Sequence, residues 1–264
     1  MSQQHIPVML KEIIEHLGPV LLSSDSPRYF DGTFGRGGHL AAILKQFPNT
    51  NAVATDQDLQ AIEFGKENFA DDIRNKKLEL YHQNFSDFDE KKLGQFDAML
   101  IDLGVSSPQL DQGIRGFSFY HEGPLDMRMD ATKGQTAADL VAALNEDELN
   151  ELFKELGEIP RPYRVVRAIV HDRKTEPFLT TRQLAGLIER VEGWHRKGFH
   201  PATQYFMALR LRVNSELEVI ENSLLKLIQG LKPRGRLAVL TFHSLEDRIV
   251  KNKLREFPEL GSPL

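Results

Sequence analysis

A glycine-rich stretch, DGTFGRGGH at residues 31–39, constrains the fold of this chain more than any other feature. Tyr29 and Phe30 before it are typical of a buried strand, and apolar residues after it recur at helical spacing: Leu40, Ile43, Leu44 and Phe47. A strand, a glycine-rich turn and a helix begin a Rossmann-type nucleotide site, because glycines admit a ligand close to the backbone and the first helical turn has unpaired N–H groups. The order Gly-x-x-Gly-x-Gly-Gly differs from the pyrophosphate fingerprint Gly-x-Gly-x-x-Gly. A turn without a ligand therefore stays open as the alternative.

The composition excludes several classes of protein. The chain has 264 residues, enough for one large domain or two modest ones, and it has no cysteine, which excludes disulfides, thiolate metal sites and a cysteine nucleophile. No apolar run approaches the ~18 residues of a membrane span, and the N-terminus MSQQHIPVML lacks the layout of a secretory signal. We therefore expect a cytoplasmic protein with no membrane partner.

Charge is unevenly distributed along the second half of the chain. Residues 104–159 carry 4 Lys and Arg against 11 Asp and Glu, a net −7, whereas residues 160–212 carry 11 against 4, a net +7. The whole chain has a formal net charge of −5, which argues against a globally basic nucleic-acid coat protein but permits a local basic surface. Such a surface would meet phosphate. The alternative is a set of helices with solvated charged faces.

Strand and helix patterns alternate in the first hundred residues. Three further strands are predicted at 52–55, 78–85 and 96–103, and a helix is predicted at 59–69. This alternation predicts βαβ units, and hence a mostly parallel sheet with helices on both faces.

The alternation stops at Gly104, and only loops and helices are predicted from there to about Arg212. Asn145 begins a capping box for the first clear helix, which Gly157 ends. Other helices are expected near 162–172, near 181–191, and from Pro201 to Gln229 with a bend at Asn214–Ser215. A turn at 232–235 and a buried strand at 237–240 follow. The sequence thus predicts an α/β domain of residues 1–110 and 213–264, interrupted by an all-helical domain of residues 111–212.

Three aspartates are predicted at the carboxyl ends of strands, where open parallel sheets bind their ligands. They are Asp31, Asp56 and Asp102. Asp56 is placed to accept hydrogen bonds from a ribose, and the alternative is that Asp56 or Asp58 caps the following helix. A metal site is disfavoured because no histidine pairing at ligand spacing accompanies the aspartates, so no metal is predicted.

NAD and S-adenosylmethionine are both compatible with these features. A diphosphate cofactor would favour amides without a nearby carboxylate. Asp31 at the entrance to the loop better suits an ammonium group and a sulfonium cation. The residues therefore favour S-adenosylmethionine, and an NAD-dependent oxidoreductase is the disfavoured alternative.

Two later segments allow two interpretations each. The loop of residues 116–130 has aromatic side chains and an arginine that could stack a splayed base, or it could pack its Phe and Met residues into a core. The segment TFHSLEDR at 241–248 predicts Ser244 as an N-cap with Asp247 at the third helical position. His243 would then face the site or satisfy the end of a strand.

Several motifs together resemble the bacterial small-subunit ribosomal RNA cytosine-N4 methyltransferase family. They are GTFGRGGH (32–39), Asp56-Gln57-Asp58, LGVSSPQLD (103–111), RGFSF (115–119), GPLDMRMD (123–130), HPAT (200–203) and FHSLEDRIVK (242–251). The resemblance implies a Rossmann-like class I methyltransferase that uses S-adenosylmethionine, with an inserted helical domain for RNA recognition. Its substrate would be a cytidine of 16S rRNA in the decoding region of the small ribosomal subunit.

The resemblance also implies site residues. Cofactor contacts fall on Gly37, Gly38, His39, Asp56, Phe85, Asp102 and Gln109, with Phe85 against the adenine. As acceptors for the amine of the target cytosine we consider Asp102, Ser106 and Pro108, and as contacts to RNA we consider Arg128, Arg164, Arg167 and Arg173.

Family members continue for several dozen residues beyond FHSLEDRIVK, whereas this chain ends at Leu264. We therefore keep a second interpretation, a protein that binds S-adenosylmethionine or ribosomal RNA without turnover. We also expect low stability or self-association through an uncovered edge of the strand at 237–242, with a homodimer as the form that self-association would take.

Overall fold

The computed structural model describes residues 6–194 and 200–257, and the chain divides into two compact units. Unit 1 comprises Met1–Gly104 and Leu217–Leu264, and unit 2 comprises Val105–Glu216. The chain passes between the units at residues 104–105 and 216–217, whereas the sequence placed the passages at 110–111 and 212–213. Each unit is described separately below.

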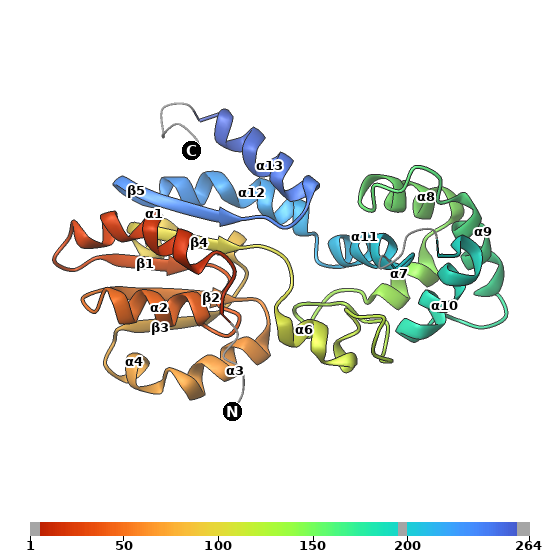
Figure 1. Cartoon of the computed structure of the whole chain (residues 1–264), viewed down its shortest axis with the longest axis horizontal. Helices are drawn as coiled ribbons and strands as arrows, with labels where there is room; N and C mark the ends of the chain where they lie inside the picture. Colours follow the sequence, from red (N-terminus) through yellow and green to blue (C-terminus); the bar gives the residue numbers. More distant parts are fainter. Residues whose placement is uncertain (1–5, 195–199, 258–264) are drawn as a thin grey trace. The chain divides into compact units, whose positions relative to one another are not determined.

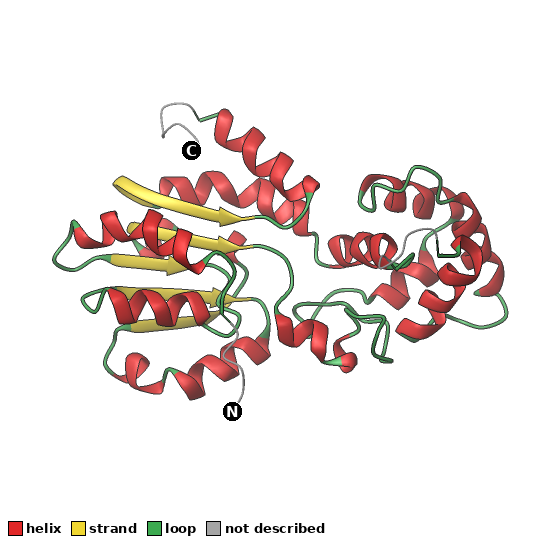
Figure 2. Ribbon diagram, in the orientation of Figure 1, coloured by secondary structure: helices red, strands yellow, loops and turns green. Residues whose placement is uncertain are grey.

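Unit 1 is built on a sheet of five parallel strands (Figures 1 and 2). The strands are β1 (Arg28–Asp31), β2 (Asn51–Asp56), β3 (Leu78–His82), β4 (Phe96–Asp102) and β5 (Leu231–Leu240). Their order is β3-β2-β1-β4-β5, and every neighbouring pair is parallel. The chain moves outward from β1 to β3 and then returns to the other side of β1 for β4. The strand order therefore reverses between β1 and β4, at the point where such sheets bind ligands.

Helices cover both faces of this sheet, as the sequence predicted. They are α1 (Leu10–Leu22), α2 (Gly38–Gln46), α3 (Leu59–Asn68), α4 (Ala70–Arg74), α5 (Glu90–Leu93), α12 (Glu216–Gln229) and α13 (Ser244–Arg255). Successive strand residues point to opposite faces: Tyr29 packs with α1 and α2, and Phe30 packs with α12 and α13. Two apolar cores thus sandwich the strands and fix where their carboxyl ends lie.

The last strand differs from its prediction. Phe96 pairs with Leu231 but Ala98 pairs with Arg236, so the predicted turn at 232–235 bulges out within β5, with Arg234 at a φ of 68°. Of the strand predicted to be buried at 237–240, only Leu240 is buried, because β5 lies at the edge of the sheet. Within the described part of the chain β5 pairs only with β4.

Two other local predictions in unit 1 were wrong. The third strand ends at His82, and Phe85 begins a short 3-10 turn that Asn84 caps. The N-cap of α13 is His243 and not Ser244; the side chain of Glu246 accepts the N–H of Phe242 at 2.9 Å, which satisfies a donor just before the helix. The sequence analysis expected Asp247 to act at the start of this helix, whereas Glu246, one position earlier, is the residue that does so.

Unit 2 is helical, apart from an isolated bridge between Pro124 and Thr180. Its helices are α6 (Ser107–Asp111), α7 (Ala137–Ala143), α8 (Glu146–Glu155), α9 (Tyr163–Asp172), α10 (Thr181–Glu192) and α11 (Thr203–Val213). The capping box at Asn145 is present. Pro201 lies before α11 and not in its first turn, and the predicted bend is a break, since Ser215 has a φ of 47° between α11 and α12.

No helix among residues 6–194 and 200–257 is long and apolar enough to cross a membrane.

Candidate functional site

Asp31, Asp56 and Asp102 are the last residues of three adjacent parallel strands, β1, β2 and β4. Asp31 is in register with Ala54 and Leu100, so the other two aspartates lie two residues further along their strands. The structure therefore brings the three predicted carboxylates to one edge of the sheet, on both sides of the point where the strand order reverses.

Hydrogen bonds from backbone N–H groups hold the glycine-rich loop between β1 and α2 in place. The N–H groups of Gly32, Phe34 and Gly37 donate to the carbonyls of Leu100, Thr55 and Phe34 at 2.9, 3.0 and 2.7 Å. Two more, those of Thr33 and Gly35, donate to the carboxylates of Asp31 and Asp56 at 3.2 and 2.7 Å. Five N–H groups of the loop are thus engaged by the protein and are not available to a phosphate, which favours a cationic ligand over a diphosphate.

Two glycines of this loop cannot be replaced without displacing neighbours. Gly37 has a φ of 68°, and a Cβ there would lie 2.6 Å from the ring of Phe69 and 2.8 Å from that of Phe34. A Cβ on Gly38 would lie 2.6 Å from the ring of Pro7. The loop is therefore pressed between two aromatic rings and the segment that precedes α1.

Asp56 and Asp58 have separate tasks. Asp58 caps α3 by accepting the N–H of Gln60 at 3.0 Å. Asp56 accepts the N–H of Gly35 at 2.7 Å and that of Asp58 at 2.8 Å. Burial raises the pKa of Asp56 to about 6, against the lowering effect of these two hydrogen bonds. The helix-cap alternative thus applies to Asp58.

Asp31 is a buried acid, only 2% exposed. Burial raises its pKa to about 7; the N–H of Thr33 lowers it, and the nearby charges of Asp102 and Asp56 raise it. The hydroxyl of Tyr29 lies 3.4 Å from its Oδ2 atom. A carboxylate surrounded by other carboxylates in this way is stabilised by a positive charge placed near all three.

Asp102 lies near a histidine and a second carboxylate, His39 and Glu246. Nδ1 of His39 lies 3.8 Å from its Oδ2, while Nε2 of His39 contacts the carbonyl of Val8 at 3.0 Å. Burial raises the pKa of Asp102, His39 lowers it, and Glu246 raises it. Its Oδ1 atom is buried without a hydrogen-bond partner among the described residues. Such an orphaned acceptor marks a place where a donor from a ligand would be stabilised.

Two residues near this edge, Thr33 and Glu246, had no role in the sequence prediction. The hydroxyl of Thr33 accepts the backbone N–H of Asp102 at 2.7 Å and so joins the loop to β4. Beyond β5, Nε2 of His243 lies 3.0 Å from Oε1 of Glu246, whose side chain is fully buried. His243 therefore pairs within its own segment. The one signal in the sequence for the role of Thr33 was its position two residues after Asp31.

Phe85 lies in the apolar core that includes Phe30, Phe88 and Ile101, and it is buried. Its Cβ atom would be 2.9 Å from a Cβ on Gly32, so it also limits the start of the glycine-rich loop. The contact with adenine that the resemblance implies stays a prediction.

The sequence pattern of one protein family, described as the MraW methylase family, matches residues 2–262. The chain belongs to the MraW methylase family. It is 57% identical to the ribosomal RNA small subunit methyltransferase H of Bdellovibrio bacteriovorus over 98% of this chain and 79% of that protein. The protein of the same name from Idiomarina loihiensis is 45% identical over 98% of this chain and 81% of its own length. The family resemblance and the methyltransferase fold class predicted from the sequence are thereby confirmed.

Two solved structures resemble this methylase only distantly. The cyclopropane synthase MmaA2 from Mycobacterium tuberculosis is 11% identical with a TM-score of 0.30, over 98% of this chain and 84% of that one. A sarcosine dimethylglycine methyltransferase from Galdieria sulphuraria, described as putative, is 9% identical with a TM-score of 0.33, over 77% and 79% of the two chains. Neither bears on the substrate of this methylase.

In unit 2 of the methylase, Ser106, Pro108 and Gln109 form the start of α6. Oε1 of Gln109 accepts the N–H of Ser106 at 2.9 Å, so this buried side chain stabilises the helix start. The carbonyl of Ser106 accepts the N–H of Gln109 at 3.0 Å, and that of Pro108 accepts the N–H of Gln112 at 3.0 Å. The carbonyl of Ser106 also accepts the N–H of Leu110 at 3.3 Å, whereas that of Pro108 keeps a second lone pair for another donor. The ligand contacts predicted for these residues stay predictions.

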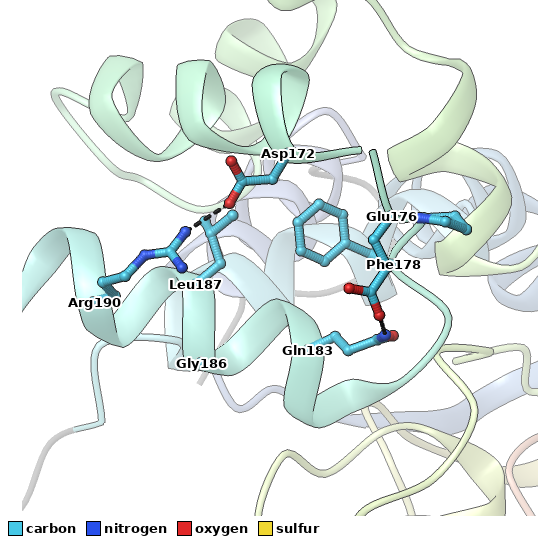
Figure 3. A pocket seen from close by; sticks show the side chains of 8 residues that line it. Asp172, Glu176, Phe178, Gln183, Gly186, Leu187 and Arg190 are labelled. Atoms are coloured by element: carbon cyan, nitrogen blue, oxygen red, sulfur yellow. Dashed lines mark hydrogen bonds and ion pairs between the residues drawn. The ribbon is translucent and has the colours of Figure 1, made fainter. Parts of the chain in front are cut away.

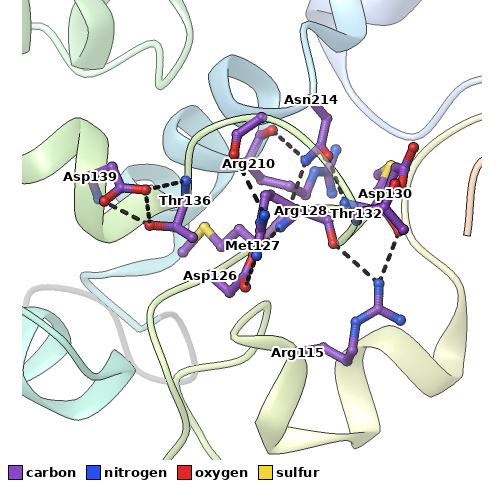
Figure 4. A network of polar contacts seen from close by, with 12 residues as sticks. Arg115, Asp126, Met127, Arg128, Asp130, Thr132, Thr136, Asp139, Arg210 and Asn214 are labelled. Carbon is purple, nitrogen blue, oxygen red and sulfur yellow. Dashed lines mark hydrogen bonds and ion pairs between the residues drawn. The ribbon is translucent and has the colours of Figure 1, made fainter.

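The GPLDMRMD segment is an internally bonded loop (Figure 4). Arg128 forms a bidentate pair with Asp126, with Nε–Oδ1 and Nη2–Oδ2 distances of 2.8 Å each. Arg115 donates to the carbonyls of Arg128 and Met129, both at 3.1 Å. Burial would raise the pKa of Asp126, but the hydrogen bonds from Arg128 outweigh it and lower that pKa. The guanidinium of Arg128, predicted to contact RNA, is thus already paired with a carboxylate.

Four apolar residues of the loop of residues 116–130 pack into the core of unit 2. Phe117, Leu125, Met127 and Met129 are all buried there. Of the two interpretations of this loop, core packing is the one observed for these side chains.

The three arginines predicted on α9 differ in their surroundings. Arg164 is exposed, and Arg167 is 76% exposed with Nε 3.5 Å from Oε1 of Glu146. Arg173 instead donates from Nη1 to the carbonyls of Val141 and Leu144, both at 2.6 Å. Arg173 therefore closes the end of α7, and its RNA contact is the least supported of the three. Arg196 and Lys197, which also contribute to the net +7, lie outside the described residues.

A cavity of about 230 Å³ lies between the C-terminal part of α9, the loop after it and α10 (Figure 3). Arg190 donates to Asp172 at 2.6 Å, and Gln183 donates to Glu176 at 2.9 Å. Asp172 pairs with Arg190 and Glu176 keeps its negative charge, so the residues that line the cavity present no unpaired cation to a phosphate.

Among the described residues no cluster of His, Asp and Glu has the arrangement of a metal site.

Proposed function

We propose that this chain transfers a methyl group from S-adenosylmethionine to the exocyclic N4 amine of a cytidine in 16S rRNA of the small ribosomal subunit. The observation that carries the proposal is the group of three carboxylates at the ends of β1, β2 and β4 in a member of the MraW methylase family. The two relatives compared above are both named as ribosomal RNA small subunit methyltransferases. A ribosomal substrate would place the activity in the cytoplasm.

The residues at the sheet edge fit S-adenosylmethionine. Its ammonium and sulfonium groups are positive, and buried carboxylates with raised pKa values gain most from a positive charge nearby. The buried, unpartnered Oδ1 of Asp102 offers an acceptor. The loop N–H groups are engaged by Asp31, Asp56 and backbone carbonyls, which disfavours the pyrophosphate of NAD.

Each carboxylate would then have its own part of the ligand. Asp31 at the loop entrance would hold the ammonium group, and Asp56 would accept the ribose hydroxyls while it keeps Gly35 in place. Gly37 and Gly38 would let the backbone approach the ligand, His39 would hold Asp102, and Phe85 would lie against the adenine. Gln109 is proposed as a further contact from unit 2.

Bound S-adenosylmethionine supplies a methyl group on a positively charged sulfur. The chain must orient a weak nucleophile toward it, because the lone pair of the cytosine amine is delocalised into the ring. An acceptor that hydrogen-bonds the amine localises that pair, and Asp102, Ser106 and Pro108 are the proposed acceptors. Most of the acceleration would come from alignment and from exclusion of water. The base must also be unstacked, which costs a few kcal/mol.

Unit 2 is proposed to recognise the RNA. Its exposed cations on α9, Arg164 and Arg167, lie three residues apart and therefore share one face of the helix. The surface pair of Arg167 with Glu146 contributes little to stability, so a phosphate can replace it. Arg128 and Arg173 complete the predicted set, although both are engaged within the unit.

The test is methyl transfer from S-adenosylmethionine to small subunits purified from cells that lack this gene, followed by mass spectrometry of 16S rRNA fragments. The proposal expects one cytidine methylated at N4. Binding of S-adenosylmethionine and RNA without any transfer would instead support the interpretation of a binding protein without turnover.

A further inference from the structure

Unit 2 carries a cluster of four aromatic rings that no part of the proposed reaction uses. At its centre lies His200, whose ring stacks on Phe119 with centroids 4.2 Å apart and an interplanar angle of 29°. Trp194 and Tyr120 meet the same imidazole at 4.9 and 5.9 Å, with interplanar angles of 74° and 75°. Two segments that are distant in the sequence, 119–120 and 194–200, thus supply rings that meet at one buried histidine.

The centre of the cluster is fixed. Nε2 of His200 lies 2.6 Å from Oε1 of Glu189, and its Nδ1 accepts the N–H of Ala202 at 3.0 Å. Because Nδ1 is an acceptor, the ring proton lies on Nε2 and points at the carboxylate. Phe119 in turn packs edge-on against Phe206, a buried residue of the unit's core, with centroids 5.1 Å apart.

The outer rings are open to solvent. Tyr120 is 68% exposed and Trp194 is 59% exposed, although large aromatic side chains usually gain by burial. Two exposed rings anchored on a rigid centre offer flat faces without any need to order flexible side chains on binding. Protein surfaces of this kind bind unpaired bases, since every base has a face that can stack.

The two sides of the cluster come from segments of opposite charge. Trp194 and His200 lie within residues 160–212, with a net charge of +7, and Tyr120 lies within residues 104–159, with a net charge of −7. The positive segment, next to exposed rings, suits a partner with a negative backbone and exposed planar groups, which is single-stranded RNA.

We propose that Tyr120 and Trp194, held by His200 and Phe119, form a stacking platform for unpaired bases of the substrate RNA. This inference rests on the proposed function for the identity of the RNA, and it adds a binding site distinct from the carboxylates of unit 1. The platform would act on bases other than the one that is methylated. Duplex RNA, whose bases are already stacked, would gain nothing from it.

The chain contains one tryptophan, so intrinsic fluorescence reports on this cluster directly. Titration of the full chain with a short, unpaired, cytidine-rich oligoribonucleotide is expected to quench Trp194 emission, and the same strand in a perfect duplex is expected to quench it far less. Tyr120→Ala is expected to weaken single-strand binding about 5- to 150-fold, the range for loss of one stacked base. Tyr163→Ala is the matched control, because Tyr163 is an exposed ring of the same unit that contacts Lys154.

Equal quenching by single strand and duplex, or unchanged affinity in a folded Tyr120→Ala chain, would overturn the platform. The platform would also be overturned if Trp194 emission changed with protein concentration and not with added RNA. That result would mean that the rings contact a second copy of the chain. A Trp194→Phe variant, followed with a labelled oligonucleotide, keeps a stacking ring and should bind better than Trp194→Ala. The assay needs no methyl transfer, so an inactive chain that still shows quenching would contradict only the proposed function.

Discussion

The Oδ2 atom of Asp56 accepts a hydrogen bond from the N–H of Gly35 at 2.7 Å, which ties the end of β2 to the glycine-rich loop after β1. The same carboxylate accepts the N–H of Asp58 through its other oxygen at 2.8 Å. Asp56 therefore helps to order the loop, and a ribose would find its acceptor already oriented.

Asp56→Ala is expected to weaken S-adenosylmethionine binding roughly 10- to 150-fold, because a ribose hydroxyl loses a charged acceptor, at about 1.5–3 kcal/mol. Calorimetry measures the loss. Asp58→Ala is the control, since it removes the cap of α3 and costs about 1 kcal/mol of stability while the ligand contact remains. Unchanged affinity in a folded Asp56→Ala chain would remove Asp56 from the site.

Binding of S-adenosylmethionine is expected to weaken as the pH falls from 8 to 5. The pKa of Asp31 is raised to about 7 and that of Asp56 to about 6, so both carboxyls take up protons in this range and lose the charge that attracts a cation. Calorimetry at several pH values, in buffers of different ionisation enthalpy, also measures the protons released on binding. Affinity independent of pH would show that neither carboxylate meets the positive charge of the ligand.

Asp31→Asn is expected to stabilise the ligand-free chain at pH 8, by up to roughly 4 kcal/mol, the free energy of a shift of about 3 pKa units. The folded state binds the Asp31 proton more tightly than the unfolded state, so this group favours folding below pH 4, and the contribution is lost as the pH rises through about 7. Thermal unfolding of Asp31→Asn and of the unsubstituted chain at pH 8 and pH 5 shows whether the substitution raises or lowers stability. If Asp31→Asn destabilised the chain equally at pH 8 and pH 5, the carboxylate would stabilise the fold through its hydrogen bonds with Thr33 and Tyr29.

Arg164→Glu with Arg167→Glu is expected to weaken RNA binding strongly and to leave S-adenosylmethionine affinity nearly unchanged. For every phosphate that the variant no longer neutralises, the log–log slope of affinity against salt should fall by up to about one. Arg74→Glu with Lys92→Glu makes the same change in net charge on exposed residues of unit 1. Retained helicity by circular dichroism, together with a wild-type RNA affinity and salt slope, would show that α9 is not the RNA surface. Arg173 is left intact because its reversal would strand the carbonyls of Val141 and Leu144.

Asn214→Ala is expected to destabilise unit 2. The side chain of Asn214 accepts the N–H of Met129 at 2.7 Å and donates to the carbonyls of Met127 and Arg210 at 2.8 and 2.9 Å. A buried group left unsatisfied costs about 1–3 kcal/mol, which urea denaturation would detect. Affinity for S-adenosylmethionine should stay the same. A stability equal to wild type would mean that the GPLDMRMD loop is held by its other contacts alone.

Local patterns in the sequence predicted the ends of β1, β2 and β4, since each aspartate directly follows an apolar strand. Because parallel strands end at the same edge, the meeting of Asp31, Asp56 and Asp102 also followed from the sequence. Contacts between distant residues did not. The hydrogen bond between Asn214 and Met129 joins residues 85 positions apart, and no local pattern encodes it.

The sequence also could not show which arginines are engaged within the fold. Arg128 looked available for phosphate, yet Asp126 two residues earlier holds it in a bidentate pair. Arg173 lies beyond the last turn of α9, where only the folded unit brings the carbonyls of Val141 and Leu144 within reach. The edge position of β5 left the predicted strand at 237–240 only partly buried, because an edge strand has a neighbour on one side alone.

The measurement that tests the central claim most directly is the position of the transferred methyl group. The purified chain would be incubated with S-adenosylmethionine and small subunits from cells that lack this gene, and the 16S rRNA would be digested to nucleosides and fragments for mass spectrometry. We predict one methyl group on the exocyclic nitrogen of a single cytidine, and none with an Asp102→Ala chain that still folds. A methyl group on a ring carbon, on a ribose or on ribosomal protein would contradict the proposed function.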